Sequence, residues 1–525
     1  MTAPLRDDVW GWRSSRTALI GLALVAFAGF CIAPLLLLVA GAFALSGDLR
    51  YGDVPLLLDI RQRGLLSTTT VFGLGAAGVS TLVGAPLGFA LARVTLPFKP
   101  LLRVALAAPA LLPTYVVALA WTYLVAPIAG DWAYSVVSAI VVMTVVCYPL
   151  SMLATEVALR RVEPRLEEAA LLVARRGAVL RRITLPLAAP AICAAALVIF
   201  VLAISEFGVP GVLRVRVFTT EVFTAFAALY DVRRATILAL PLTAVSLVTA
   251  AAAAILIRER TLTTRRGLAV GAPVAFDTWR RPALAIIVCV IVVAVLMPLA
   301  VLAVEAQRAA SIVRAVQASQ RAVINSLGLA TIGATMVTAV ATFLAYARVR
   351  AAHRTGTVAD ILMIFLFTVP STVIGVGLIG LWNRAGPLGA FYGTAAMPVV
   401  GYLARFIPVA TLAIAAAMRS VPVAHEEAAA VSGSGWFRTM TRIVLPQIRT
   451  GLLAAWTVSF ILAFGEVGTT ILVAPAGEST LPIRVYTMIA NAPPGQVAAL
   501  ALFQSAVGLC PLMLLGGALA SRDTT

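Results

Sequence analysis

Lysine is almost absent from this chain of 525 residues. The only lysine, Lys99, lies in the tripeptide Phe98-Lys99-Pro100. A Walker A loop needs Gly-Lys followed by serine or threonine, because its lysine reaches the phosphates of the bound nucleotide. The chain therefore has no standard P-loop. We expect it to carry no cofactor, and any ATP and Mg²⁺ chemistry that drives it to belong to partner subunits.

Cysteine and histidine are also scarce, which argues against a metal site. The two histidines, His353 and His425, are far apart in sequence and lie between apolar runs. The cysteines lie in or beside apolar runs without the spacing of metal ligands, as small buried hydrophobic residues do. They are Cys31, Cys147, Cys193, Cys289 and Cys510. No group of nucleophile, base and metal ligands is visible, so the chain is predicted not to be an enzyme.

Charged residues make up only 12% of the chain, against about a quarter in soluble globular proteins. Hydrophobic residues make up 61%, enough for about a dozen spans of roughly 20 residues. The runs are continuous, and backbone groups in hydrocarbon must be paired internally, so an all-α polytopic membrane protein is predicted. The net charge of +18 reflects arginines in cytoplasmic loops rather than nucleic-acid binding, because no basic domain lies outside the spans.

The sequence indicates one unit of six spans written twice in the same orientation. We expect a first half at residues 1–257, an arginine-bearing cytoplasmic linker at 258–282 and a second half at 283–525. Both termini are then cytoplasmic. Landmarks recur at a nearly constant offset: Pro109 and Trp121 match Pro370 and Trp382, and Ala92-Arg93 matches Ala347-Arg348. The first span of each half is least like its counterpart and is predicted to be peripheral to the shared core.

A polar loop between two apolar runs carries the most specific motif, and each half has one copy. The second copy consists of Glu426, Glu427, Ala428, Ala429, Gly433, Leu445 and Pro446. The first copy consists of Glu167, Glu168, Ala169, Ala170, Leu185 and Pro186. The first copy departs from the pattern at the glycine, where Val173 stands and the nearest glycine is Gly177. Its acidic pair also lies one residue closer to its proline.

These two loops resemble the EAA loop of ABC-importer permeases, the loop that docks into the ATPase subunit. The resemblance covers about residues 60–255 and 320–515, and the nearest branch is the ferric-iron permeases with two fused halves. It implies a type I permease fold in the bacterial inner membrane, surrounded by lipid. It also implies two copies of an ABC ATPase and an extracytoplasmic substrate-binding protein. Related permeases carry thiamine, polyamines, sulfate or phosphonate, so the substrate stays open.

One glutamate lies about 20 residues after each Leu-Pro, and a glycine follows it two residues later. The pairs are Glu206 with Gly208, and Glu466 with Gly468. An ionisable group at membrane depth usually faces a polar cavity or a partner. One interpretation places both glutamates on the translocation pathway between the halves, and the other leaves them solvated at the outer interface. Arg405 is not duplicated, and three roles fit it: a pair with a carboxylate such as Glu466, a place on the pathway, or a side chain that reaches the interface.

A secondary transporter driven by an ion gradient is the alternative from a different class. Such a protein would want intramembrane carboxylates for its coupling ions, and this chain has few candidates. It would also have no need for two matched Glu-Ala-Ala loops. Genes for ATPase subunits beside this one would favour the ABC importer.

Overall fold

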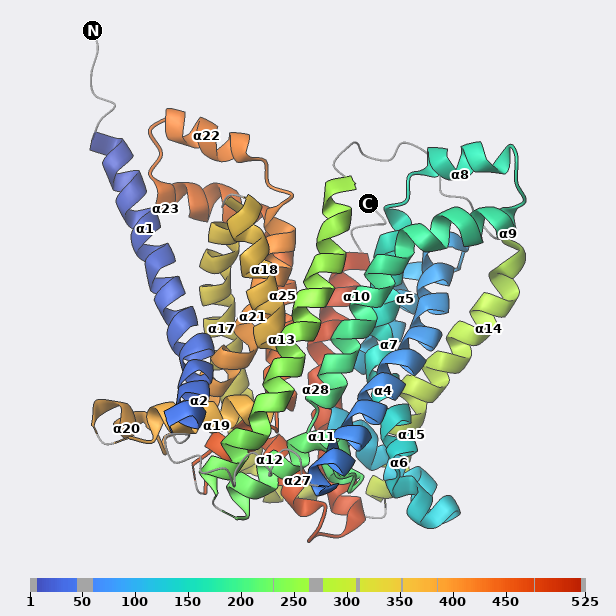
Figure 1. Ribbon diagram of the computed structural model, residues 1–525, viewed down its shortest axis with the longest axis vertical. Helices are drawn as coiled ribbons and strands as arrows, with labels where there is room; N and C mark the ends of the chain where they lie inside the picture. Colours follow the sequence, from blue (N-terminus) through green and yellow to red (C-terminus); the bar gives the residue numbers. More distant parts are fainter. Residues whose placement is uncertain are drawn as a thin grey trace. The chain divides into compact units, whose positions relative to one another are not determined.

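The computed structural model describes residues 7–44, 60–229, 231–263, 277–307, 312–350, 353–384, 386–475 and 477–520. Every regular element in these ranges is a helix (Figure 1). Nine of the described helices are long and apolar enough to cross a membrane, and two bent pairs of helices would each add one more. α28 (Pro494–Ala520) adds 27 residues without a charged side chain. The predicted all-α polytopic fold is confirmed.

The helices pack into two compact units, and the larger one comprises Ala42–Val323, Thr368–Val373 and Thr480–Thr525. It contains α4 (Ile60–Arg93), α5 (Lys99–Ala107), η3 (Ala108–Leu111), α6 (Thr114–Ala129), η4 (Gly130–Tyr134), α7 (Val136–Arg160), α8 (Pro164–Leu171), α9 (Arg176–Val179), η5 (Leu180–Thr184), α10 (Leu185–Ile204), α11 (Gly208–Val212), α12 (Phe218–Ala227), α13 (Val232–Thr263), η6 (Asp277–Trp279), α14 (Arg280–Ile291), η7 (Val292–Leu296), α15 (Met297–Gln307), α16 (Ile312–Ala318), α27 (Leu481–Met488) and α28.

The smaller unit comprises Met1–Gly41, Ile324–Phe367 and Ile374–Ser479. It contains most or all of α1 (Asp7–Phe27), η1 (Ala28–Ile32), α2 (Ala33–Ala44), α17 (Gln320–Arg350), α18 (His353–Thr368), α19 (Ser371–Trp382), α20 (Pro387–Phe391), α21 (Ala396–Met418), α22 (Val423–Val431), α23 (Trp436–Thr439), η8 (Met440–Val444), α24 (Leu445–Gln447), α25 (Arg449–Gly465) and α26 (Thr470–Val473).

The first span of each half packs against helices of the other half. In the smaller unit, the thiol of Cys31 donates to the carbonyl of Leu403 in α21 at 3.6 Å, and Phe30 stacks on Trp382. In the larger unit, α14 packs against α4 and α5, and α15 packs against α6 of the first half as well as against α28 of its own half. The packing units therefore differ from the sequence halves. α13 continues into the predicted linker as far as Thr263, and linker residues 264–276 lie outside the described residues.

Four π turns lie in the described part of the chain, and each ends two residues before a proline. The pairs are η1 with Pro34, η5 with Pro186, η7 with Pro298, and η8 with Pro446. After each π turn, the next backbone N–H bonds the carbonyl five residues back. Proline lacks an N–H, and its ring clashes with the carbonyl four residues back, so a widened turn before it relieves the clash. The matched turns at Pro34 and Pro298 relate the two first spans, which look least alike in sequence.

The third span of the second half is broken, with α18 and α19 meeting at 96°. Pro370 lies in the break, as Pro109 lies in η3 between α5 and α6 of the first half. An interrupted helix leaves carbonyls that need donors inside a membrane. In the larger unit the carbonyl of Thr368 accepts from Ser205 Oγ at 2.8 Å and from Ser246 Oγ at 3.4 Å.

Glycines allow a close contact between α4 and α7 in the larger unit. A Cβ atom at Gly84 would lie 2.4 Å from the carbonyl oxygen of Tyr148, and one at Gly88 would lie 2.3 Å from that of Met152. Both neighbours are backbone atoms, which cannot move aside without moving the helix. The glycine-rich stretch at residues 84–88 therefore fixes how closely the two helices approach.

Gly88→Ala is predicted to destabilise the protein by about 1–3 kcal/mol, because the added methyl overpacks the contact with α7. Gly78→Ala is the matched control on the same helix, since a Cβ there meets nothing within 4 Å. Thermal unfolding of the two purified variants in detergent measures the difference. Equal midpoints for Gly88→Ala and Gly78→Ala would contradict the role assigned to this contact.

Candidate functional site

Each EAA-like loop folds into a short helix, a turn and a second short helix that leads into a π turn. The first loop (residues 164–186) contains α8, α9 and η5, and the second loop (residues 423–446) contains α22, α23 and η8. Pro164 starts α8 and Pro422 precedes α22, as suits a residue without an N–H at a helix start. α8 has eight residues and α22 has nine. The shorter distance from the acidic pair to the proline in the first copy therefore comes from a first short helix with one residue fewer.

In the first loop, a buried ion pair ties α8 to the end of α4. Arg93 Nη1 lies 2.9 Å from Glu167 Oε2, and Nη2 donates to Oε1 at 2.9 Å. The side chains of Arg93 and Glu167 are 1% and 2% exposed. Arg93 also donates to the carbonyl of Leu159, and Thr184 donates its hydroxyl to Glu167 at 2.7 Å. One carboxylate therefore joins α4, α8 and the π turn that precedes α10.

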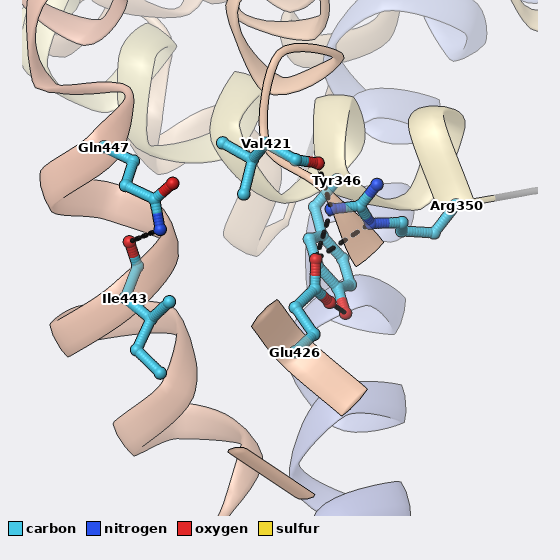
Figure 2. Close-up of polar contacts among 6 residues, drawn as sticks. All are labelled: Tyr346, Arg350, Val421, Glu426, Ile443 and Gln447. Carbon is cyan, nitrogen blue, oxygen red and sulfur yellow. Dashed lines mark hydrogen bonds and ion pairs between the residues drawn. The ribbon is translucent and has the colours of Figure 1, made fainter. Parts of the chain in front are cut away.

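In the second loop, the equivalent ion pair ties α22 to the end of α17 (Figure 2). Arg350 Nε donates to Glu426 Oε1 at 2.9 Å, Arg350 Nη2 donates to the same oxygen, and the Tyr346 hydroxyl donates to Oε2 at 2.7 Å. Arg350 also donates to the carbonyl of Val421, just before α22. Tyr346 packs edge-on against Trp436 of α23, so the arginine, the tyrosine and the second loop form one cluster.

The hydroxyl group that donates to the buried glutamate comes from the π turn in the first loop and from the preceding span, α17, in the second. Thr184, which serves Glu167, has Val444 as its counterpart 260 residues on. Tyr346, which serves Glu426, has Phe89 as its counterpart 257 residues back. Both carboxylates are thus bound by one arginine and one hydroxyl, although neither hydroxyl position is repeated.

The sequence comparison matched Arg93 with the wrong arginine. It paired Arg93 with Arg348, whereas Arg350 makes the contact with Glu426 that Arg93 makes with Glu167. Arg348 instead pairs with Asp360 of α18. One helical turn of α17 carries both arginines, and the Ala-Arg pattern alone could not distinguish them.

The two loops turn differently where Val173 stands in place of the glycine. Gly433 has a φ of +74°, and its N–H donates to the carbonyl of Ala430 while Ser434 donates to that of Ala429. These are the two bonds of a Schellman motif. A valine resists positive φ, and the described part of the first loop has none. There the N–H groups of Val173 and Ala174 both donate to the carbonyl of Ala170. Gly177 lies within α9 and takes no part in this turn.

The acidic pairs and alanines divide between a buried and an exposed face. Glu167, Glu426 and Ala429 are buried, whereas Glu168, Ala169, Glu427 and Ala428 are exposed and Ala170 is half-buried. Large apolar side chains at the end of each short helix are also exposed: Leu172 and Val173 at 86% and 89%, and Val431 at 85%. Each loop therefore presents small and apolar side chains and one glutamate outward, while its buried glutamate anchors the opposite face.

The two loops connect differently to the spans that follow. Residues Arg176–Ile204 form one continuous span, whereas α24 and α25 are separated by a bend of 78°. In the second loop the side-chain amide of Gln447 donates to the carbonyl of Ile443 at 3.0 Å (Figure 2). Leu187 stands at the matching position of the first loop and has no donor to offer. Leu185 and Pro186 therefore lead straight into α10, whereas Leu445 and Pro446 lead to a break.

Glu206 closes the turn after α10 in the larger unit. Its Oε1 accepts from the backbone N–H of Gly208 at 2.8 Å and from the hydroxyl of Thr114 at 2.8 Å. The turn is tight at Gly208, where a Cβ would lie 3.0 Å from that same oxygen and 3.1 Å from Tyr115. The half-buried carboxylate thus holds the start of α11 against the start of α6.

Glu466 makes the equivalent turn after α25 in the smaller unit. Its Oε1 accepts from the backbone N–H of Thr469 at 2.8 Å, and Gly468 is buried in the same turn. Its Oε2 lies 3.2 Å from Nε of Arg405, so of the three roles that fitted Arg405 the structure shows the pair with a carboxylate. The assignment of Glu206, Glu466 and Arg405 to a pathway remains a prediction.

The sequence did not reveal the residues that bind the buried glutamates of the two loops, Glu167 and Glu426. These residues are Arg93, Thr184, Arg350 and Tyr346. The signal available was an arginine at the end of the second span of each half, about 75 residues before its glutamate in the chain. Among the residues described, no group of three or more His, Cys, Asp or Glu side chains has the arrangement of a metal site.

Residues 338–522 match the family described as "Binding-protein-dependent transport system inner membrane component". The Fe(3+)-transport system permease protein FbpB 2 of Haemophilus influenzae is 24% identical over 447 residues, which cover 84% of this chain and 87% of that protein. The putative ferric transport system permease protein FbpB 1 of the same organism is 31% identical over 164 residues, 31% of this chain and 25% of that protein.

The spermidine/putrescine transport system permease protein PotC of Escherichia coli is 23% identical over 201 residues, 38% of this chain and 74% of that protein. Residues 338–522 therefore match this permease family, and the similarity to FbpB 2 extends over most of the chain, in accordance with the resemblance of its two EAA-like loops. The described helices are those of a multi-pass membrane protein.

Glu426→Gln is predicted to destabilise the purified chain by roughly 3–5 kcal/mol, because it leaves the charge of Arg350 buried and uncompensated. Glu427→Gln changes the exposed neighbour by the same atoms and should leave the midpoint of thermal unfolding within about 0.5 kcal/mol of the wild type. Replacing both Arg350 and Glu426 by leucine should recover part of the loss, since no unpaired charge then remains. A loss of stability in Glu427→Gln as large as that in Glu426→Gln would contradict the role assigned to the Arg350–Glu426 pair.

Proposed function

We propose that this chain supplies both halves of the membrane channel of an ATP-driven importer, with one ATPase subunit docked at each loop. The supporting observation is the ion pair that recurs in both loops, Arg93–Glu167 and Arg350–Glu426. Each loop has a carboxylate buried on an arginine of the preceding span and an apolar surface turned outward. A surface of this kind suits insertion into a partner, and two such loops suit two copies of an ATPase. ATP and Mg²⁺ would bind in those subunits.

The same arrangement supports a route for movement from the ATPases to the membrane helices. A displaced α8 or α22 would carry with it the end of α4 or α17, through the pairs Arg93–Glu167 and Arg350–Glu426. The first loop also leads without a break into α10. Alternating access in transporters moves helix bundles as rigid bodies, and these connections would deliver the movement to two helices of a bundle.

The orientation we propose puts both loops and both termini in the cytoplasm of a bacterial cell, with the chain in the inner membrane. Arginines crowd the first loop, in accordance with the positive-inside rule. Within the smaller unit the start of α1 lies beside the second loop: Arg16 stacks over Tyr346 at 5.5 Å, and α1 packs against α23 (Figure 1). The N-terminus and the second loop would therefore share one side.

For the substrate we propose ferric iron, delivered by an extracytoplasmic binding protein. The support is the similarity to FbpB 2, which extends over both halves of the chain. A polyamine is the second candidate, supported by the similarity to PotC over 74% of that protein. A secondary transporter is disfavoured, because the two glutamates that could couple an ion are engaged in local turns and an arginine pair.

Val431→Asp is predicted to reduce binding of the ATPase subunits at least tenfold without lowering the thermal stability of the isolated chain. The reason is that an aspartate at this 85% exposed position would be buried, unpaired, in the partner's groove. Ile128→Asp is the matched control, since Ile128 is 82% exposed in α6, at the end predicted to be extracytoplasmic. Pull-down stoichiometry and ATPase stimulation provide the measurement. Full assembly in Val431→Asp and its equivalent Leu172→Asp would reject docking at the loops.

The substrate is tested by reconstituting the chain with its ATPases and its binding protein in liposomes. We expect ATP-dependent uptake of radiolabelled ferric iron and none of spermidine. Uptake of spermidine alone would select the polyamine candidate. Uptake that continues without ATPase subunits and follows an imposed ion gradient would replace the importer with the secondary transporter. Calorimetric titration of the co-encoded binding protein with each ligand provides the independent check.

A further inference from the structure

A cluster of positive charge gathers at one end of the larger unit, where α5 begins and α7 ends. Glu156 of α7 accepts hydrogen bonds from Arg103 at 3.1 Å (Nε) and 2.6 Å (Nη2), and its Oε1 lies 2.8 Å from Nη2 of Arg160. Lys99, the only lysine of the chain, is close enough for all three of these charges to affect it. Two arginines thus pair with a single carboxylate that is 4% exposed, and the Lys99 ammonium lies within the electrostatic range of all three.

The charges in this cluster do not cancel. Burial lowers the pKa of the Lys99 ammonium, and the positive charges of Arg160 and Arg103 lower it further, against the opposing effect of Glu156. An added anion would remove this repulsion. In the second half, Asp360 stands near the position matching Arg103 and pairs with Arg348.

Exposed apolar side chains flank the cluster. Phe98 has a φ of +49°, unusual for a residue with a side chain, and its ring is 80% exposed directly before Lys99. Leu101 is 67% exposed one residue beyond Pro100. Trp279 is 56% exposed, lies edge-on to Phe89 of α4, and precedes Arg280 and Arg281 at the start of α14, which packs against α5. Aromatic and basic residues together at the end of a span are typical of the membrane interface.

We propose that Lys99, Arg103 and Arg160 bind the phosphate headgroup of an anionic phospholipid, phosphatidylglycerol or cardiolipin, whose acyl chains lie along Phe98 and Leu101. A phosphodiester supplies the negative charge that the cluster lacks, and basic recesses between spans on the cytoplasmic side bind such headgroups. The exposed rings favour a lipid over free phosphate, because a free ion would leave them in water. The leaflet rests on the orientation proposed above.

The site adjoins the anchor of the first loop. Arg93, which holds Glu167, also donates to the carbonyl of Leu159, the residue directly before Arg160. A headgroup on Arg160 therefore lies one residue from the contact that fixes α8. A bound lipid would stiffen the end of α7 against which the first loop is held.

The test is native mass spectrometry of the purified full-length chain, titrated with phosphatidylglycerol, cardiolipin or phosphatidylcholine. The variant is Lys99→Gln/Arg160→Gln, which leaves Glu156 paired with Arg103. At about 1 kcal/mol per cation, the tightest anionic-lipid site should weaken roughly 30-fold. Arg181→Gln/Arg182→Gln removes the same charge from exposed arginines of the first loop and should keep that site.

Equal anionic-lipid binding by the wild type and Lys99→Gln/Arg160→Gln would overturn the proposal, as would equal losses in the two double variants. Binding of phosphatidylcholine at the same affinity would overturn it too. Competition by millimolar inorganic phosphate at this site would replace the lipid with a soluble anion. The single variant Arg160→Gln, with an expected loss of about fivefold, serves if the double variant fails to fold. No ATPase, binding protein or substrate enters the assay, so failure of the transport proposal leaves its outcome unchanged.

Discussion

A carboxylate held by an arginine away from water fixes each loop of this permease. Such a pair adds little net stability, because desolvation of the two charges offsets most of their attraction. Its importance lies in the cost of separating it, since either charge left alone in the same place is strongly unfavourable. Glu167 and Arg93, like Glu426 and Arg350, must therefore move together. The short helix of each loop becomes part of the span that precedes it, and the exposed alanines and apolar ends remain available to a partner.

The two halves reach this result with different residues, and the connections that leave the loops are unequal. Glu167 is also bound by Thr184, at the base of a continuous span, so the first loop holds both the helix before it and the helix after it. Glu426 is bound by Tyr346 of the preceding helix, and the chain bends by 78° before α25. With one ATPase at each loop, as proposed above, equal movements would therefore act on one half through two helices and on the other chiefly through one.

The sequence predicted the fold class, the spans and the loops, because each depends on local composition: long apolar runs, arginines in the loops, and Glu-Ala-Ala followed by Leu-Pro. It also offered the pair of Arg405 with Glu466 as one of three roles, and it located the departure of the first loop from the motif at Val173. It missed Arg93 and Arg350 as partners, because each lies more than 70 residues from its glutamate and only the packing of helices brings them together. It matched Arg348 in place of Arg350 for the same reason, and it gave no sign that the first spans pack against the opposite halves.

That exchange of first spans bears on how the gene arose. A duplicated unit whose two copies each lend a helix to the other has the arrangement of a domain-swapped dimer, in which identical protomers trade one element. Such an exchange of helices forms most simply while the two copies are still separate and identical chains. Fusion of the chains afterwards preserves it. The matched π turns before Pro34 and Pro298 are what such a shared ancestor would leave in both first spans. The linker between the halves would then have been added to an interlocked pair rather than having created it.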